Sequence, residues 1–406
     1  MKYNPRLNER TARLAGFADL HPLQPEYQVQ GALRLMWHLE EALKAITGMA
    51  GVTLQPAAGA HGELTGILMI QKALETRGEA REEVLVPDSA HGTNPATAVF
   101  AGYQAVEIPS AEDGTVDMDA LDRLMTERVA AVMMTVPNTL GVFEHRILEV
   151  AELVHGRGGF IYLDGATLTA FVGRAVAGRR GAPAMHINLH PTFSPPQGGG
   201  GPGAGPVAVS DALLPHLPVP RVVKEGDRFR LLWDDSASIG AMRSFYGSFL
   251  VLVRALTYIR SLGADGLREM SDVAVLYANL IRHRLIESYH LEYDSPSMHE
   301  VVFDDSIQAE HDVHNTDIAK RLLDYGFHPP TMSFPLIVHG ALMIEPTEST
   351  SPEEVEAFCD AMLAIAREAE EDPELVKSAP HDTPVRRVDE VRAARSLKVR
   401  WLPDDE

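Results

Sequence analysis

The sequence predicts an α/β protein with one large, mostly parallel sheet and a smaller C-terminal α+β lobe. Helical and strand-like patterns alternate from about residue 28 to 265, which is typical of parallel sheets covered by helices. Short strands and helices follow in mixed order. Because a single core stops growing at roughly 250–300 residues, a chain of 406 residues should form two lobes, which we place at 1–265 and 266–406.

The large lobe is expected to begin with an N-terminal arm and then to alternate helices with strands. The predicted helices span 29–48, 61–78, 94–104, 118–127 and 147–158. The predicted strands span 52–57, 83–88, 105–110, 129–138, 159–165, 184–190 and 205–210. In open α/β sheets, ligands bind beyond the carboxyl ends of the strands, so motifs on the loops that follow these strands should converge.

The second lobe is expected to follow a helix at 267–288. Its predicted strands span 289–295, 299–305 and 341–348, and its helices 317–327 and 351–371. A tail from about residue 372 carries a further amphipathic helix within 379–397. The single cysteine, Cys359, lies within the amphipathic helix 351–371, so we expect it to be a buried apolar residue.

Composition excludes several classes of protein. A net charge of -21 and a pI near 5.2 argue against nucleic-acid binding, which depends on clustered Lys and Arg. No apolar run approaches the roughly 20 residues of a membrane span, and the N-terminus lacks the apolar core of a signal peptide. A single cysteine favours a reducing compartment. We therefore expect a cytoplasmic protein with no membrane or nucleic-acid partner.

Two motifs place polar groups at the predicted carboxyl edge of the sheet. "QPAAGAHGE" sets Gly59, Ala60 and His61 at a helix N-terminus, where free N–H groups and the helix dipole favour an anion such as phosphate. "VPDSAHGTNPA" puts His91 just beyond the next strand. A packing turn of small residues and a structural histidine are the alternative interpretations.

Two further motifs extend this edge. "TVPNTLGVFE" places Asn138 and Thr139 after a buried strand, where they would orient a ligand oxygen or simply form a turn. In "IYLDGATL", Asp164 closes an apolar strand, and its charge needs a partner such as a protonated ring nitrogen, unless it caps the next segment. The glycine run from Gly198 onward allows close approach of a ligand or a neighbouring subunit.

Read in order, these stretches resemble the P-protein of the glycine cleavage system, in the second subunit of its two-subunit form. The resemblance covers nearly the whole chain through motifs that include "MKYNP", "LQPAAGAHGELTG", "VPDSAHGTNPA", "PNTLGVFE", "NLHPTFSPPQGGGGPGAGP", "DYGFHPPTMSFPL" and "APHDTPVRR". It implies the aminotransferase-like fold of type I pyridoxal phosphate (PLP) enzymes. In that family glycine forms a Schiff base with PLP and loses CO2, and its aminomethyl group passes to the lipoyl arm of the H-protein.

The resemblance also implies roles for individual residues and for partners. It assigns the turn at Gly59, Ala60 and His61 to the PLP phosphate, His91 to the ring face, Asn138 or Thr139 to the ring hydroxyl, and Asp164 to the pyridine nitrogen. A carboxylate there keeps the nitrogen protonated, so that the ring accepts electrons. The implied partners are the first P-protein subunit or a second copy of this chain, and the lipoylated H-protein.

The chain departs from the family at one position above all. The family motif is "LHKTFS", whose lysine binds PLP covalently, and this chain has Pro191 in place of that lysine. Proline has no amine, and it should restrict His190 toward extended conformations. PLP would therefore not be bound covalently at position 191. No lysine lies between Lys72 and Lys224, which makes Lys224 the nearest downstream candidate for a replacement.

Other departures flank this position. Thr167 and Thr169 stand where the family has asparagines, and Gln197 stands in the family's "FSTPHGGGG" segment. In the family, a segment ending "GSCT" precedes "MKYNP", so either the start codon was misplaced or an arm near the active site is absent. Three interpretations remain open: a glycine decarboxylase, a catalytically inactive paralogue that acts as a partner or regulatory subunit, and altered chemistry on non-covalent PLP. In the last, Thr167, Thr169 and Gln197 would contact the substrate.

Overall fold

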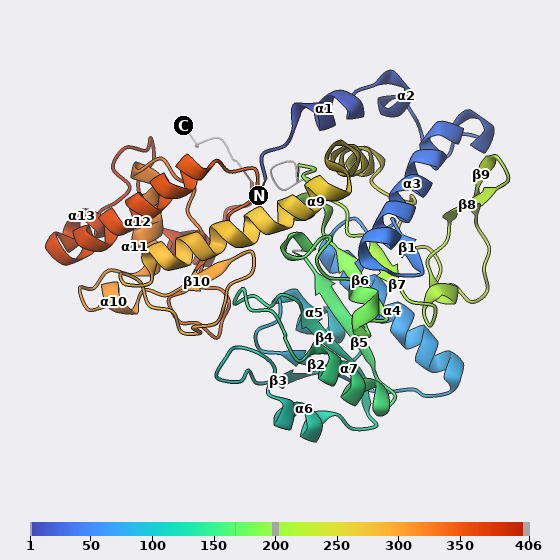
Figure 1. Cartoon of the computed structure of the whole chain (residues 1–406), viewed down its shortest axis with the longest axis horizontal. Coiled ribbons are helices and arrows are strands. Elements are labelled where there is room, and N and C mark those ends of the chain that lie inside the picture. Colours follow the sequence, from blue (N-terminus) through green and yellow to red (C-terminus); the bar gives the residue numbers. More distant parts are fainter. Residues whose placement is uncertain (1, 167, 197–202, 401–406) are drawn as a thin grey trace.

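A seven-stranded sheet forms the centre of the large lobe (Figure 1). The computed structural model describes residues 2–166, 168–196 and 203–400. The strand order is β1-β7-β6-β5-β4-β2-β3, and β7 runs antiparallel to both of its neighbours. The strands are β1 (Gly51–Thr53), β2 (Glu83–Pro87), β3 (Gln104–Ile108), β4 (Val129–Thr135), β5 (Phe160–Gly165), β6 (Ala184–Ile187) and β7 (Val207–Val209). The predicted mostly parallel sheet is confirmed.

Helices cover both faces of this sheet. All residues of β4 are buried, which explains why this strand is a continuous apolar run. Its successive side chains enter different cores: Val132 and Met134 pack in one cluster and Met133 in the other. The helices of this lobe are α3 (Gln30–Thr47), α4 (Gly59–Arg77), α5 (Thr93–Phe100), α6 (Met118–Leu124), α7 (Ile147–Gly156) and α8 (Leu189–Phe193), preceded by α1 (Arg6–Ala12) and α2 (Ala15–Ala18) in the N-terminal arm.

A long helix, α9 (Phe249–Leu285), joins the two lobes (Figure 1). Its regular geometry breaks at Gly263, where φ is 65° and ψ is -171°. The sequence prediction of a helix at 267–288 captured only the part beyond this break. The proposed domain boundary at 265/266 lies close to Gly263, and it stays a prediction.

The second lobe contains a three-stranded antiparallel sheet of order β10-β12-β11. Its strands are β10 (Val301–Phe303), β11 (Thr331–Met332) and β12 (Leu342–Ile344), and its helices are α10 (Ser306–Ala309), α11 (Asn315–Asp324), α12 (Pro352–Glu371), α13 (Pro373–Lys377) and α14 (Glu390–Arg395). Cys359 is fully buried on α12, as predicted, and burial raises the pKa of its thiol to about 11.

Three details differ from the sequence prediction. The predicted strand at 289–295 is wrong, because that segment contributes only an isolated bridge from His290 to Asp304. The antiparallel hairpin of β8 (Arg221–Glu225) and β9 (Arg228–Leu232) was not predicted. The strand predicted at 184–190 ends at Ile187 and is followed by α8.

Helix α8 also corrects the expected backbone of His190, which is helical rather than extended. Pro191 is the third residue of α8, and N–H groups in the first turn of a helix have no intrahelical acceptor. The proline therefore fits the helix without loss of a hydrogen bond, even though it disfavours a helical residue before it.

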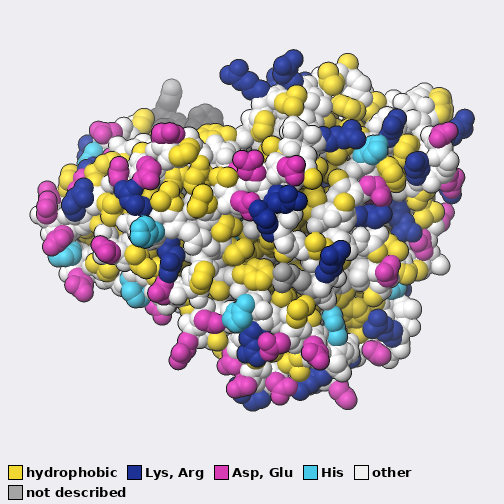
Figure 2. All heavy atoms as spheres, in the orientation of Figure 1, with side chains coloured by type: hydrophobic (Ala, Val, Ile, Leu, Met, Phe, Trp, Pro, Cys, Tyr) yellow, Lys and Arg dark blue, Asp and Glu magenta, His cyan; other side chains and the backbone are white. Residues whose placement is uncertain are grey.

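In Figure 2, Asp and Glu side chains are interspersed with Lys and Arg over the face shown. Within the part of the chain that the structure describes, no helix is both long and apolar enough to cross a membrane.

Candidate cofactor site

A cleft of about 240 Å³ lies between the carboxyl edge of the large sheet and the second lobe. The loops after β2, β4, β5 and β6 form one wall, as expected from the strand directions. The large-lobe residues that line it are His91, Thr135, Thr139, Ala166, Asn188, His190 and Pro191. The opposite wall consists of Glu300, Thr331, Phe334, Met343, Glu345 and Thr347, together with Lys2 from the N-terminal arm.

Asp164 lies at the end of β5 and is 1% exposed. Its Oδ2 accepts a hydrogen bond from Asn94 Nδ2 at 2.9 Å, and its Oδ1 accepts one from the backbone N–H of Ala166 at 2.9 Å. His186 Nε2 lies 3.2 Å from Oδ1. These donors satisfy the charge of the buried carboxylate and fix its orientation.

A buried tyrosine contacts His186 on the ring nitrogen that does not face Asp164. The Tyr162 hydroxyl lies 2.8 Å from His186 Nδ1, and burial raises the pKa of this phenol well above its ordinary value. His186 therefore lies between Tyr162 and Asp164 and supports the carboxylate from behind, within the sheet.

His91 lies on the loop after β2. Its backbone N–H donates to Thr135 Oγ1 at 2.8 Å, and its Nδ1 lies 2.7 Å from Thr93 Oγ1. The ring packs against Phe334 of the second lobe, with the ring centroids 6.0 Å apart. His91 therefore bridges the two walls of the cleft.

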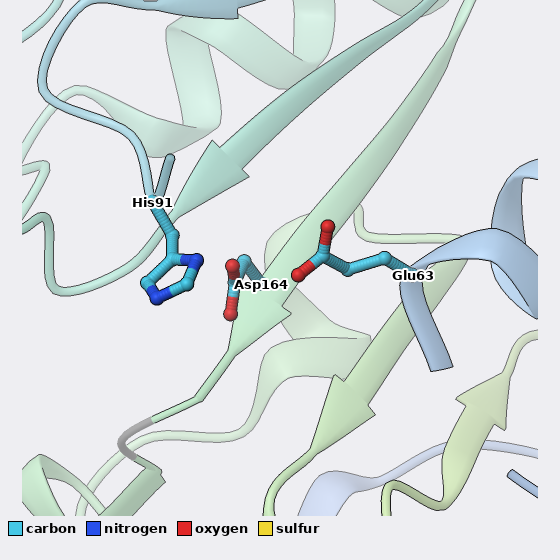
Figure 3. A group of neighbouring side chains, drawn as sticks. All are labelled: Glu63, His91 and Asp164. Carbon is cyan, nitrogen blue, oxygen red and sulfur yellow. The ribbon is translucent and has the colours of Figure 1, made fainter. Parts of the chain in front are cut away.

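Glu63, which the sequence analysis did not single out, completes this cluster. Figure 3 shows Glu63, His91 and Asp164 pointing toward one another, and one ligand atom from each lies within 4.8 Å of the others. Thr93 Oγ1 and Thr97 Oγ1 donate to the two oxygens of Glu63 at 2.5 Å and 3.0 Å. Both carboxylates thus have protein donors. The sequence feature that could have identified Glu63 as a site residue is an acidic side chain near the apolar start of a helix.

The turn at Gly59, Ala60 and His61 begins α4 close to Asn188 and Gly205. A Cβ on Gly59 would lie 2.2 Å from Asn188 Oδ1, and one on Gly205 would lie 2.2 Å from the carbonyl oxygen of Ala58, so neither position has room for a side chain. The His61 ring accepts a hydrogen bond from Ala57 N–H at 3.2 Å, and burial lowers its pKa. The cleft-lining residue next to this turn is Asn188, whose buried Oδ1 has no hydrogen-bond partner among the described residues.

The side chains of Asn138 and Thr139 have different positions in the structure. The Asn138 side chain donates to the Gly114 carbonyl at 2.6 Å and accepts from the N–H groups of Leu140 and Val142, so its amide organises the turn. Thr139 donates its hydroxyl proton to the Ser89 carbonyl at 2.9 Å and lines the cleft.

The remaining candidates differ in position. Thr169 is buried and donates to the Pro191 carbonyl at 3.1 Å. Thr167 and Gln197 lie outside the described residues. Lys224 lies on the β8–β9 hairpin, with its Nζ 5.0 Å from the Trp37 ring centroid, and it does not line the cleft. Burial lowers the pKa of His190 to about 4, so this ring is neutral at pH 7.

The solved structures share this architecture. A crystal structure of glycine decarboxylase (P-protein) of the glycine cleavage system in inhibitor-bound form is similar with a TM-score of 0.76 and 20% identity, covering 90% of this chain and 83% of that one. This match shows the α/β fold of type I PLP-dependent enzymes.

The sequence comparisons are closer. The family profile "Glycine dehydrogenase, C-terminal domain" matches residues 270–386. A probable glycine dehydrogenase (decarboxylating) subunit 2 from Chlorobium chlorochromatii is 55% identical over 400 residues, 98% of this chain and 83% of the relative. The protein of the same name from Caldanaerobacter subterraneus is 52% identical over 99% of this chain and 83% of the relative. The chain therefore belongs to the family of glycine dehydrogenase (decarboxylating) subunit 2.

Proposed function

We propose that this chain binds PLP in the cleft without a covalent bond at position 191 and that its ordinary glycine-cleavage activity is strongly impaired. The observation that carries the proposal is a contrast within one site. The buried Asp164 network, His91 and the close-packed helix turn are all present, whereas Pro191 stands where the family has lysine. The residues that would hold PLP without a covalent bond fit the cofactor, whereas Pro191 offers no amine for a covalent bond.

Each of these residues would contact a different part of PLP. Asp164, held by Asn94 and His186, would pair with the pyridine nitrogen. His91 would pack against the ring, Thr139 would lie near the ring hydroxyl, and the first N–H groups of α4, at Gly59, would bind the phosphate. PLP, when bound, supplies an electron sink for a bond broken next to the substrate nitrogen.

The substrate and partners follow from the family. The relatives' name indicates glycine as the substrate and a first subunit as the partner. We propose the same for this chain, with the lipoylated H-protein as aminomethyl acceptor. Loss of the lysine amine should lower turnover by several orders of magnitude, because that amine takes part in both exchange of the substrate and proton transfer.

Pro191 favours a second candidate function as well. A chain that keeps the fold and loses the reactive amine would serve as a non-catalytic partner or regulatory subunit. Thr169, which donates to the Pro191 carbonyl, would then have a structural role in supporting α8.

A PLP titration tests the proposal. Equilibrium dialysis and absorbance should show saturable binding, and Asp164→Asn should weaken it by about tenfold, because the ring nitrogen loses its counter-charge. Asp235→Asn, which removes an ion pair with Arg221 outside the cleft, is the matched control and should bind normally. Absence of saturable binding by the unaltered chain would refute the cofactor site.

An activity measurement separates the two candidate functions, an impaired enzyme and a non-catalytic subunit. Glycine–bicarbonate exchange, measured with a first subunit and lipoylated H-protein, should be detectable but far below that of a lysine-bearing relative. PLP binding and complex formation without any exchange would instead support the non-catalytic subunit.

A further inference from the structure

Lys2 lies at the cleft wall beside position 191. We propose that the ε-amine of Lys2, carried by the N-terminal arm, replaces the missing amine of position 191 and forms an imine with the aldehyde of PLP. This inference rests on the proposed function, because it requires PLP in the cleft. It assigns a reactive role to a residue that is distant in sequence from every motif of the site.

The position of the amine carries the inference. Lys2 Nζ donates to the carbonyl oxygen of Thr192 at 3.0 Å, which places it next to Pro191 in the chain's α8 helix. Lys2 lines the same cleft as Pro191 and His91, and among the described residues it is the lysine that does so. A second segment of the chain thus brings a primary amine to the place where α8 no longer carries one.

The arm holds this amine in a fixed position. The backbone N–H of Tyr3 donates to Ser349 Oγ at 3.0 Å, and its carbonyl accepts from Ser194 Oγ at 3.2 Å. Farther along, Glu9 of α1 pairs with Arg254 of α9 at 2.7 Å. These contacts bind the arm to both lobes. The Lys2 side chain is 1% exposed, so little of its freedom remains to be lost on reaction.

The residues around Lys2 also supply an acceptor for the proton of its ammonium group. Glu348 Oε2 lies 2.9 Å from Lys2 Nζ, and the Tyr258 hydroxyl donates to the other carboxylate oxygen. Burial lowers the pKa of the Lys2 ammonium, which favours the neutral amine. Glu345, on the same wall, also lies close enough to interact with this ammonium. An adjacent carboxylate can therefore accept a proton when the amine is needed as a nucleophile.

The reaction balances without any further reactant. Lys2 transfers a proton to Glu348, and the nitrogen lone pair forms a bond to the aldehyde carbon. The aldehyde oxygen leaves as water with the two protons that remained on the amine nitrogen, and a carbon–nitrogen double bond to Lys2 remains. No atom is oxidised or reduced, so neither an oxidant nor a reductant is required.

Borohydride reduction followed by peptide mapping tests the inference. The full chain is incubated with PLP, reduced and digested, and the pyridoxyl adduct is quantified on every lysine. Lys2 should carry about tenfold more adduct than Lys44, because Lys44 pairs with Glu41 on its own helix and does not line the cleft. Fragment ions separate an adduct on Lys2 Nζ from one on the α-amino group of the chain.

Two variants separate reactivity from structure. Lys2→Arg keeps a cation for Glu348 and cannot form an imine, so it should abolish the adduct while the thermal midpoint stays close to that of the unaltered chain. Lys44→Arg is the matched control and should leave the Lys2 adduct unchanged. Equal labelling of Lys2 and Lys44, or adduct only on the α-amino group, would overturn the inference.

Dialysis distinguishes failure of the Lys2 inference from failure of the proposed cofactor site. If PLP binds saturably and Asp164→Asn weakens it, yet Lys2 is not modified, the cofactor site stands and the role of Lys2 is rejected. If PLP is not retained at all, both the proposed function and this inference are rejected.

Discussion

At the scale of single residues, Pro191 carries no amine and fits the helix in which it lies. It lies in the first turn of α8, where a missing N–H costs no helical hydrogen bond. Its carbonyl still accepts from Thr169. The same backbone should therefore accept lysine at this position, and the effect of the substitution can be measured on reactivity alone.

Pro191→Lys should restore covalent attachment of PLP at position 191. In the mapping experiment the adduct should move from Lys2 to the new lysine, and the thermal midpoint should shift by no more than about 4 °C. Glycine exchange with the first subunit and H-protein should rise above that of the unaltered chain. If neither adduct nor exchange increases, the neighbouring departures at Thr169 and Gln197 have also altered the site.

His190 gives a second prediction at this scale, which concerns pH. Burial lowers its pKa from 6.5 to about 4, so between these values the unfolded chain binds a proton that the folded chain does not. The free energy of unfolding should therefore fall as pH drops from 6.5 toward 4. His190→Gln should lessen this fall in urea titrations at several pH values. An identical pH dependence in both proteins would contradict the lowered pKa.

At the scale of elements, α4 packs on β5 through a glycine. A Cβ on Gly66 would lie 2.2 Å from Cε2 of Tyr162, whose buried ring is held by its hydrogen bond to His186. This close contact sets the distance between helix and sheet directly behind Asp164.

Gly66→Ala should therefore destabilise the protein. Alanine gains about 1 kcal/mol in helix propensity, but overpacking against a fixed ring costs about 1–3 kcal/mol, so we expect a net loss of about 1 kcal/mol. Gly31→Ala in α3 is the control, because nothing lies within 4 Å of its added Cβ. Urea unfolding measures both. A stabilised Gly66→Ala protein would show that the Tyr162 ring moves aside.

The elements also show what sequence can predict. The parallel strands were recognisable because β4 and β5 are apolar on both faces, and the motifs after them converge by topology. The first half of α9 was missed because "FLVLVRALTYIR" is apolar over a length that suits a strand or a helix. The β8–β9 hairpin was missed because its exposed residues are charged.

The site was predictable only in part, for a related reason. Asp164 and His91 follow strands and could be placed by topology. Lys2 reaches the cleft through a contact with Thr192 that spans 190 residues of sequence, and no local pattern encodes such a contact. Asn138 carried two interpretations, and only the structure showed that its amide bonds the turn.

At the scale of the whole molecule, the chain carries a net charge of -21, and acidic and basic side chains are interspersed on the face shown in Figure 2. Such a charge keeps isolated copies apart at low ionic strength and makes specific assembly depend on complementary surfaces. The family name of the relatives indicates assembly with a first subunit.

We therefore expect this chain to form a complex with a first subunit whether or not PLP is bound. Size-exclusion chromatography with light scattering, at about 10 µM of each protein, should show one species of higher mass than either alone. An unrelated acidic protein is the control. Separate elution of the two chains would argue against both the enzyme and the partner-subunit interpretations.

The buried position of Lys2 has a practical consequence for anyone who handles this protein. Any residues joined directly before Met1 would be next in the chain to an amine that lies in the wall of the cleft. Residues 384–396, in contrast, are exposed along their length. Tags placed after this tail would leave the arm in its native contacts, and spectra recorded on such protein would report the unmodified cleft.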